Sequence, residues 1–177
     1  MSDGLEGKLA LARVPRTPGK TLAKLAGHKS WAVRADVASN PRTPSKALVR
    51  LADDIGAETS LLVSPRMIKR YFGHRIARFA DLAHRHNAKL LFHTDGNVRQ
   101  IIPDLIAWGV DILDPVQPEV PAMNHRELKA EFGDRLCFSG GVSAQRVLPS
   151  GSVDEVKAEA RRVIRELGAG GGYVLSP

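Results

Sequence analysis

The spacing of apolar and polar residues changes near residue 53, which predicts two unlike parts. Before that point, apolar residues recur at helical spacing in two similar segments. Beyond it, short apolar runs alternate with longer amphipathic stretches. Such alternation favours parallel βαβ units with right-handed crossovers, in which residues 48–52 serve as the opening strand. The pattern predicts further strands at 89–93, 110–113, 135–139 and 172–175, and helices at 67–84, 98–108, 124–132 and 153–167.

The first part of the chain repeats itself. Residues 15–26 return 26 positions later as residues 41–52, with 8 of the 12 positions identical. In each copy a threonine can cap a helix that starts at proline, and leucines three apart then face one side. A period of this length indicates stacked helical units, and a pair of them needs support from the structure that follows.

Composition limits the cellular compartment and the partners that the sequence predicts. Because Cys137 is the only cysteine of 177 residues, internal disulfides are excluded and a reducing cytoplasm is favoured. No apolar stretch approaches the roughly 18–20 residues of a membrane span, and residues 1–4 lack a signal peptide's start, so no membrane partner is predicted. Residues 1–57 hold 10 Lys/Arg against 5 Asp/Glu, but Trp31 is their only aromatic residue. This favours a solvated helical surface over nucleic-acid binding.

Polar residues gather where the predicted strands end. His93 and Asp95 close one apolar run just before a helix, a position that carries chemistry in βα-built enzymes. We expect the carboxyl ends of the strands to line one shared active-site opening, the mouth. The catalytic candidates there are Asp114 and Gln117, and the metal candidates are His93 and Asp95. The substrate-binding candidates are Asp95, Asn97, Gly140 and Gly141.

Each candidate also has a structural interpretation. His93 and Asp95 can hydrogen-bond at the mouth and orient substrate or a loop, which is the interpretation we favour. Asp114 can cap a strand end before Pro115. Gly140 and Gly141 can form a tight turn that needs positive φ.

The repeats resemble a known family. Val33-Arg34, Asn40-Pro41, Thr43-Pro44 and Leu51-Ala52 follow the pattern of the leucine-rich repeat variant family over about residues 9–53. The resemblance implies a right-handed stack of short helices that binds a protein partner or serves as a scaffold. Some members carry an iron–sulfur cluster on preceding cysteines, which the absence of cysteine before residue 137 excludes here.

Residues 53–177 resemble the C-terminal half of the uroporphyrinogen decarboxylase superfamily, which includes corrinoid-linked methyltransferases. The segments 93–97 (HTDGN) and 114–118 (DPVQP) look closest to the methyltransferase-like branch. The resemblance implies a (β/α)8 barrel, which needs about 250 residues when complete. We therefore expect an α/β fold with a partial barrel of about four βα units at 53–177, fused or truncated, behind an all-α repeat segment at 1–52.

The resemblance implies two activities. One is methyl transfer involving a corrinoid or a thiol, with zinc held by a His-x-Cys pair and a later cysteine. Here Asp95 stands in place of the first cysteine, and Asp114 or Glu119 are candidates to complete the set, so zinc is a candidate and no cofactor is fixed. The other is metal-free decarboxylation of a porphyrinogen, in porphyrin metabolism, where Asp114 could mimic the carboxylate that holds the pyrrole NH groups.

The alternative function is a catalytically inactive fragment. In that case the repeats bind a protein partner, and the partial barrel is a remnant or pairs with a second copy. A homodimer would close the open edges of the sheet, where unpaired backbone groups favour association.

Overall fold

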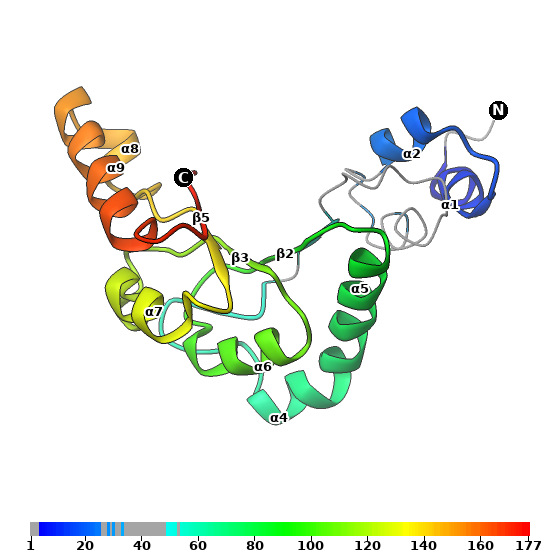
Figure 1. Ribbon diagram of the computed structural model, residues 1–177, viewed down its shortest axis with the longest axis horizontal. Helices are drawn as coiled ribbons and strands as arrows, with labels where there is room; N and C mark the ends of the chain where they lie inside the picture. Colours follow the sequence, from blue (N-terminus) through cyan, green and yellow to red (C-terminus); the bar gives the residue numbers. More distant parts are fainter. Residues whose placement is uncertain (1–3, 26–27, 29, 31–32, 34–48, 53) are drawn as a thin grey trace.

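The N-terminal part of the chain forms a small helical unit with its own apolar cluster. The computed structural model describes residues 4–25, 28, 30, 33, 49–52 and 54–177. The helices α1 (Leu5–Arg13) and α2 (Gly19–Leu25) come first (Figure 1). The Thr17 hydroxyl, expected to cap a helix, donates instead to the Leu11 carbonyl at 2.6 Å, which ties the start of α2 to α1. The second repeat copy lies outside the described residues up to residue 48. The cluster consists of Ala12, Leu22, Leu25 and Val33.

A parallel sheet of five strands forms the centre of the molecule. Its strands lie side by side in sequence order, which confirms the predicted α/β arrangement. β1 and β5 are the outer strands of the described sheet, and pairing with a second copy there stays a prediction. The strands are β1 (Val49–Ala52), β2 (Leu90–His93), β3 (Ile112–Asp114), β4 (Cys137–Ser139) and β5 (Tyr173–Val174).

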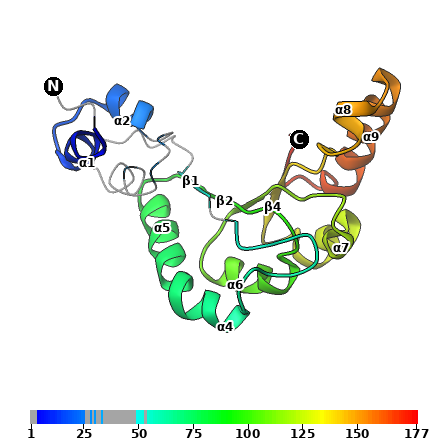
Figure 2. The same ribbon diagram turned by 180° about the vertical axis from the view of Figure 1, so that it is seen from behind.

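Helices connect the strands, and α5, α6 and α7 lie along one side of the sheet (Figures 1 and 2). Ser64 starts α4 by accepting a bond from the Met67 amide, and Ser152 and Glu155 start α9 with a reciprocal capping box. The elements are α4 (Pro65–Ile68), η1 (Lys69–Gly73), α5 (His74–Arg85), η2 (Arg99–Ile101), α6 (Ile102–Ala107), η3 (Pro121–Met123), α7 (His125–Phe132), α8 (Val147–Ser150) and α9 (Val153–Leu167).

The strand register separates an apolar row from a polar one. Phe92, Leu113 and Phe138 are aligned on neighbouring strands and are fully buried in the main core. The next residue of β2 is His93 and the next residue of β3 is Asp114, which are aligned with each other. Because successive side chains of a strand point to opposite faces, these two lie on the face away from the core, at the carboxyl ends of the strands.

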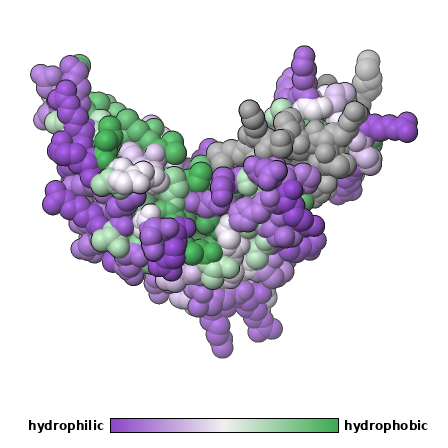
Figure 3. All heavy atoms as spheres, in the orientation of Figure 1, coloured by the Kyte–Doolittle hydropathy of each residue, from purple (hydrophilic) through white to green (hydrophobic). Residues whose placement is uncertain are grey.

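Apolar side chains gather on the surface at one end of the molecule. The α1–α2 unit lies at one end and α8–α9 at the other, with the sheet between them (Figures 1 and 2). Hydrophilic side chains cover the outer rim, whereas apolar ones gather on the inner side of the α8–α9 arm and in the hollow beside it (Figure 3). Among the described residues, no helix has the length and apolar character of a membrane span.

Candidate functional site

Three side chains with metal-ligand atoms meet at the carboxyl ends of β1 and β2. Asp54, His93 and Asp95 each offer one such atom, and these atoms lie within 4.8 Å of one another. The strand register explains the meeting, because Ala52 is aligned with His93. Asp54 and Asp95 each follow an aligned residue by two positions and so reach the same place.

Backbone and side-chain hydrogen bonds hold the two loops together. The Asp95 amide donates to Asp54 Oδ1 at 3.0 Å, and the Ile55 amide donates to the buried Thr94 hydroxyl at 3.0 Å. The Asn97 amide donates to the Ala57 carbonyl at 2.7 Å. The loop after β1 is therefore fixed against the loop after β2 along its length.

Two glycines permit this close approach. A Cβ atom on Gly56 would lie 2.4 Å from the Asp95 carbonyl oxygen. Gly96 has a φ of +83°, and a Cβ there would lie 2.6 Å from the Ala57 carbonyl oxygen. Since both contacts are to backbone, any larger residue would push the loops apart.

The His93 imidazole has two neighbours at the same nitrogen. Nδ1 lies 2.7 Å from Asp114 Oδ2 and 2.7 Å from Arg50 Nη2, and Arg50 and Asp114 form an ion pair at 3.6 Å. A protonated Nδ1 donates to Asp114, whereas an unprotonated one accepts from Arg50, so each tautomer makes one of the two bonds. In either case Nδ1 is engaged, which leaves Nε2 as the nitrogen for a ligand.

Gln117 joins the same group of loops, and Asn97 faces away from it. Gln117 Oε1 accepts a bond from the Gly96 amide at 2.8 Å, which ties the loop after β3 to the loop after β2. Asn97 Nδ2 donates to the Thr59 carbonyl at 3.3 Å, and its Oδ1 accepts from the Arg99 amide at 3.4 Å. The structure thus brings together His93, Asp95, Asp114 and Gln117, while the Asn97 side chain holds the 57–60 turn.

Gly140 and Gly141 follow β4 and pack against other residues. Their φ angles of +88° and +93° match the tight-turn interpretation. The Gly140 amide donates to the Val174 carbonyl at 3.1 Å. A Cβ on Gly140 would lie 2.8 Å from Pro115 Cβ, and one on Gly141 would lie 3.1 Å from His125 Cε1. Their role in substrate binding stays a prediction.

The third metal-ligand candidate is Asp54, which the sequence interpretation did not assign. Asp114 and Glu119, expected as candidates, are engaged elsewhere: Asp114 contacts His93, and Glu119 accepts a hydrogen bond from the Ser143 hydroxyl. The offset of two residues from the end of a strand, shared with Asp95, is the signal that identifies Asp54.

The available donors are one imidazole and two carboxylates. This set suits zinc and other divalent first-row metals. It contains no thiolate, because the chain's single cysteine, Cys137, lies on β4 outside this cluster. Burial raises the pKa of the Cys137 thiol, which keeps it protonated at neutral pH.

Comparison with known proteins places the later part of the chain in one family. The family model described as uroporphyrinogen decarboxylase (URO-D) matches residues 46–177, and the model described as leucine rich repeat variant matches residues 31–54. Two curated proteins described as methylcobamide:CoM methyltransferase MtaA, from Methanosarcina barkeri and its strain Fusaro / DSM 804, are each 28% identical over 116 residues. The matches cover 66% of this chain and 31% of each relative.

A solved structure shares the fold. A methyltransferase from Methanosarcina mazei superposes with a TM-score of 0.59 at 21% identity, over 88% of this chain and 46% of that one. This likeness supports the α/β partial-barrel architecture. The chain spans about a third of the curated relatives and about half of the solved neighbour.

Proposed function

Because the chain belongs to the uroporphyrinogen decarboxylase (URO-D) family, we propose that its strand ends form part of a methyl-transfer site. The proposed reaction moves a methyl group from a corrinoid to a thiol, as the names of the Methanosarcina relatives suggest. The observation that carries the proposal is the meeting of Asp54, His93 and Asp95 at the carboxyl ends of β1 and β2. Activity of the whole protein is part of the proposal, since the chain spans only part of its relatives.

The cluster offers the number of protein ligands that a catalytic metal centre needs. Three protein ligands with a further position open is the arrangement that catalytic zinc sites use. Asp54, His93 and Asp95 would hold the metal, with His93 using Nε2 because Nδ1 is engaged. A bound divalent metal would lower the pKa of a thiol, so that the thiol reacts as a thiolate.

Other residues of the chain would position the reactants. Asp114 holds the His93 ring through Nδ1, and Gln117 holds the loop that carries Asp95 through the Gly96 amide. The half-exposed Arg50 guanidinium places a positive charge beside His93. That charge would favour an acceptor that carries an anionic group as well as its thiol.

The proposal is tested with purified, zinc-loaded protein given methylcobalamin and coenzyme M. We expect one tightly bound zinc per chain and a loss of methylcobalamin absorbance as methyl is transferred. His93→Ala should lose both the metal and the transfer, whereas His86→Ala, at the end of α5, should keep both. Zinc that binds equally well to His93→Ala would refute the metal centre. Zinc-loaded protein without transfer would refute the reaction, and turnover of uroporphyrinogen by metal-free protein would favour decarboxylation.

A scaffold function for the N-terminal segment is a second candidate. The duplication of residues 15–26 at 41–52 and the match to leucine rich repeat variants support it. We propose that this segment binds a protein partner through its basic surface, where Lys20 and Lys24 are exposed on α2. Reversing both charges should abolish cross-links between α2 and a partner, and cross-links that survive the reversal would contradict this surface.

A further inference from the structure

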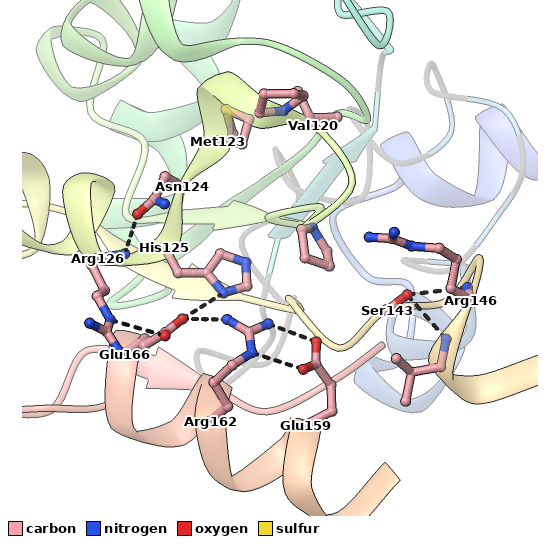
Figure 4. A pocket seen from close by; sticks show the side chains of 13 residues that line it. Val120, Met123, Asn124, His125, Arg126, Ser143, Arg146, Glu159, Arg162 and Glu166 are labelled. Carbon is pink, nitrogen blue, oxygen red and sulfur yellow. Dashed lines mark hydrogen bonds and ion pairs between the residues drawn. The ribbon is translucent and has the colours of Figure 1, made fainter. Parts of the chain in front are cut away.

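A cavity lies between α7, α8 and α9, apart from the cluster of Asp54, His93 and Asp95 (Figure 4). Its volume of about 540 Å³ is in the range of small-molecule sites. The loops after β3 and β4 form its remaining walls. The residues that matter for its chemistry are His125, Arg126, Arg146, Glu159, Arg162 and Glu166.

His125 brings an unsatisfied acceptor to the cavity. It is the first residue of α7, and its side chain is only 2% exposed. Nε2 lies 3.0 Å from the Val116 carbonyl, which can only accept, so Nε2 carries the hydrogen. Burial lowers the pKa of His125, which keeps the ring neutral and leaves a lone pair on Nδ1. Within the described structure, this buried Nδ1 has no hydrogen-bond partner.

A carboxylate faces that lone pair. Glu166 Oε2 lies 3.7 Å from His125 Nδ1 and accepts a hydrogen bond from Arg162 Nη1, whereas Nδ1 itself has no donor among the described residues. Figure 4 shows both side chains on the same wall of the cavity. A buried acceptor without a donor is costly, and a group with several N–H bonds would satisfy Nδ1 and add a bond to the Glu166 carboxylate at the same time.

The buried wall also carries two carboxylates that share one guanidinium. Arg162 pairs with Glu159 at 2.7 and 2.8 Å and also with Glu166, so one guanidinium serves two carboxylates. The two carboxylate side chains are only 14% and 11% exposed. Arg126 reaches Glu166 at 3.0 Å from outside, where it is largely in water. The Glu166 carboxylate beside Nδ1 would therefore favour a cationic donor over an anionic group at the inner end of the cavity.

The outer end has the opposite character. Arg146, at the start of α8, is exposed and extends toward the cavity from the side opposite His125 (Figure 4). Its only ion pair among the described residues is a long one of 3.9 Å to Glu119. Its guanidinium therefore retains donors for an acidic group.

We propose that this cavity binds a small amphoteric molecule, with its ammonium group between His125 and Glu166 and its acidic group at Arg146. An ammonium group offers three donors and no acceptor, which matches the two facing acceptors. The site uses none of the metal-ligand candidates, so it stands independently of the proposed methyl transfer.

Three matched probes test the assignment: 4-aminobutyrate, butylamine and butyrate. Titration calorimetry measures affinity, and nitrogen NMR of the His125 ring reports whether Nδ1 accepts a hydrogen bond. We expect 4-aminobutyrate to bind and shift the Nδ1 signal, butylamine to bind about tenfold more weakly, and butyrate not to bind, since a charge-assisted bond is worth about a factor of ten or more.

Variants separate the two ends of the proposed site. Arg146→Ala should weaken 4-aminobutyrate about tenfold and leave butylamine unchanged. Arg135→Ala, an exposed arginine outside the cavity, should change neither affinity. His125→Leu should weaken both amines. Glu166→Gln should do the same, and it serves as the test if His125→Leu fails to fold. Butyrate binding as tightly as 4-aminobutyrate, or a crystal grown with 4-aminobutyrate that shows only water at Nδ1, would overturn the proposal.

Discussion

His93 Nδ1 lies 2.7 Å from Asp114 Oδ2, although 21 residues separate them in the sequence. The contact follows from the register of two neighbouring parallel strands, in which His93 and Asp114 are aligned terminal residues. It places the imidazole and the carboxylate at one edge of the sheet, as a shared mouth requires. A carboxylate behind a metal-binding histidine also fixes the ring and raises its basicity.

Removing that carboxylate should weaken metal binding. In Asp114→Ala the ring of His93 loses its partner at Nδ1, and we expect zinc affinity to fall about 10- to 100-fold. Competition titrations with a chelator of known affinity measure the change. Asp134→Ala, an exposed acidic residue after α7, is the matched control and should leave the affinity unchanged. An equal affinity in Asp114→Ala would show that Asp114 does not support a metal ligand.

Gly56→Ala should separate the two loops that carry the cluster. The added methyl would lie 2.4 Å from the Asp95 carbonyl oxygen, so the backbone must shift. We expect the free energy of unfolding to fall by about 1–3 kcal/mol, as for other overpacked sites. Zinc affinity should fall with it, because Asp54 moves away from Asp95. Urea denaturation and chelator competition measure the two effects.

The matched control for this glycine is Gly4→Ala. A Cβ at Gly4, the N-cap of α1, would have no neighbour within 4 Å, so zinc affinity should stay as in the parent protein. If Gly56→Ala lowers stability yet binds zinc normally, the loop contact is structural and does not position the cluster.

The order and type of the elements in the later part could be predicted from the sequence, because strands and amphipathic helices alternate there. The predicted strand starts were less accurate. Residues 110 and 135 were assigned to strands. The Val110 amide instead donates to the Leu105 carbonyl near the end of α6, and the Arg135 and Leu136 amides donate to the Phe132 carbonyl at the end of α7. Val110 and Leu136 carry apolar side chains that are typical of strands, whereas their backbone amides still bond to the end of the preceding helix.

The site was predicted in part. His93, Asp95, Asp114 and Gln117 follow consecutive strands, so their meeting could be inferred from parallel topology alone. Asp54 and Arg50 were missed because their position depends on how β1 is aligned with β2, which no local pattern records. The burial of His125 likewise depends on how α7 packs against α9, a contact between distant segments.

Asp95→Cys should convert the cluster toward a softer metal site. The substitution introduces the thiolate that the resemblance to zinc-dependent methyltransferases implies at this position, and thiolates favour zinc over harder metals. We expect zinc affinity to rise relative to manganese affinity. Cobalt-loaded Asp95→Cys should also show a sulfur-to-cobalt charge-transfer band, which cobalt-loaded Asp95→Ser should lack. Absence of that band in a folded, cobalt-binding Asp95→Cys protein would place the metal away from residue 95.

His125 should make the protein less stable in mild acid. Burial holds its pKa below the ordinary value of about 6.5, so between those two values the unfolded chain binds a proton that the folded chain does not. Stability is therefore present above about pH 6.5 and is lost as the pH falls toward the pKa of the folded state, by at most about 1.4 kcal/mol per pH unit. Urea denaturation at several pH values should give a shallower acid decline for His125→Gln than for the parent protein. His86→Gln, at the C-terminal end of α5, should keep the steeper decline, and parallel curves for all three proteins would show that His125 is not the titrating group.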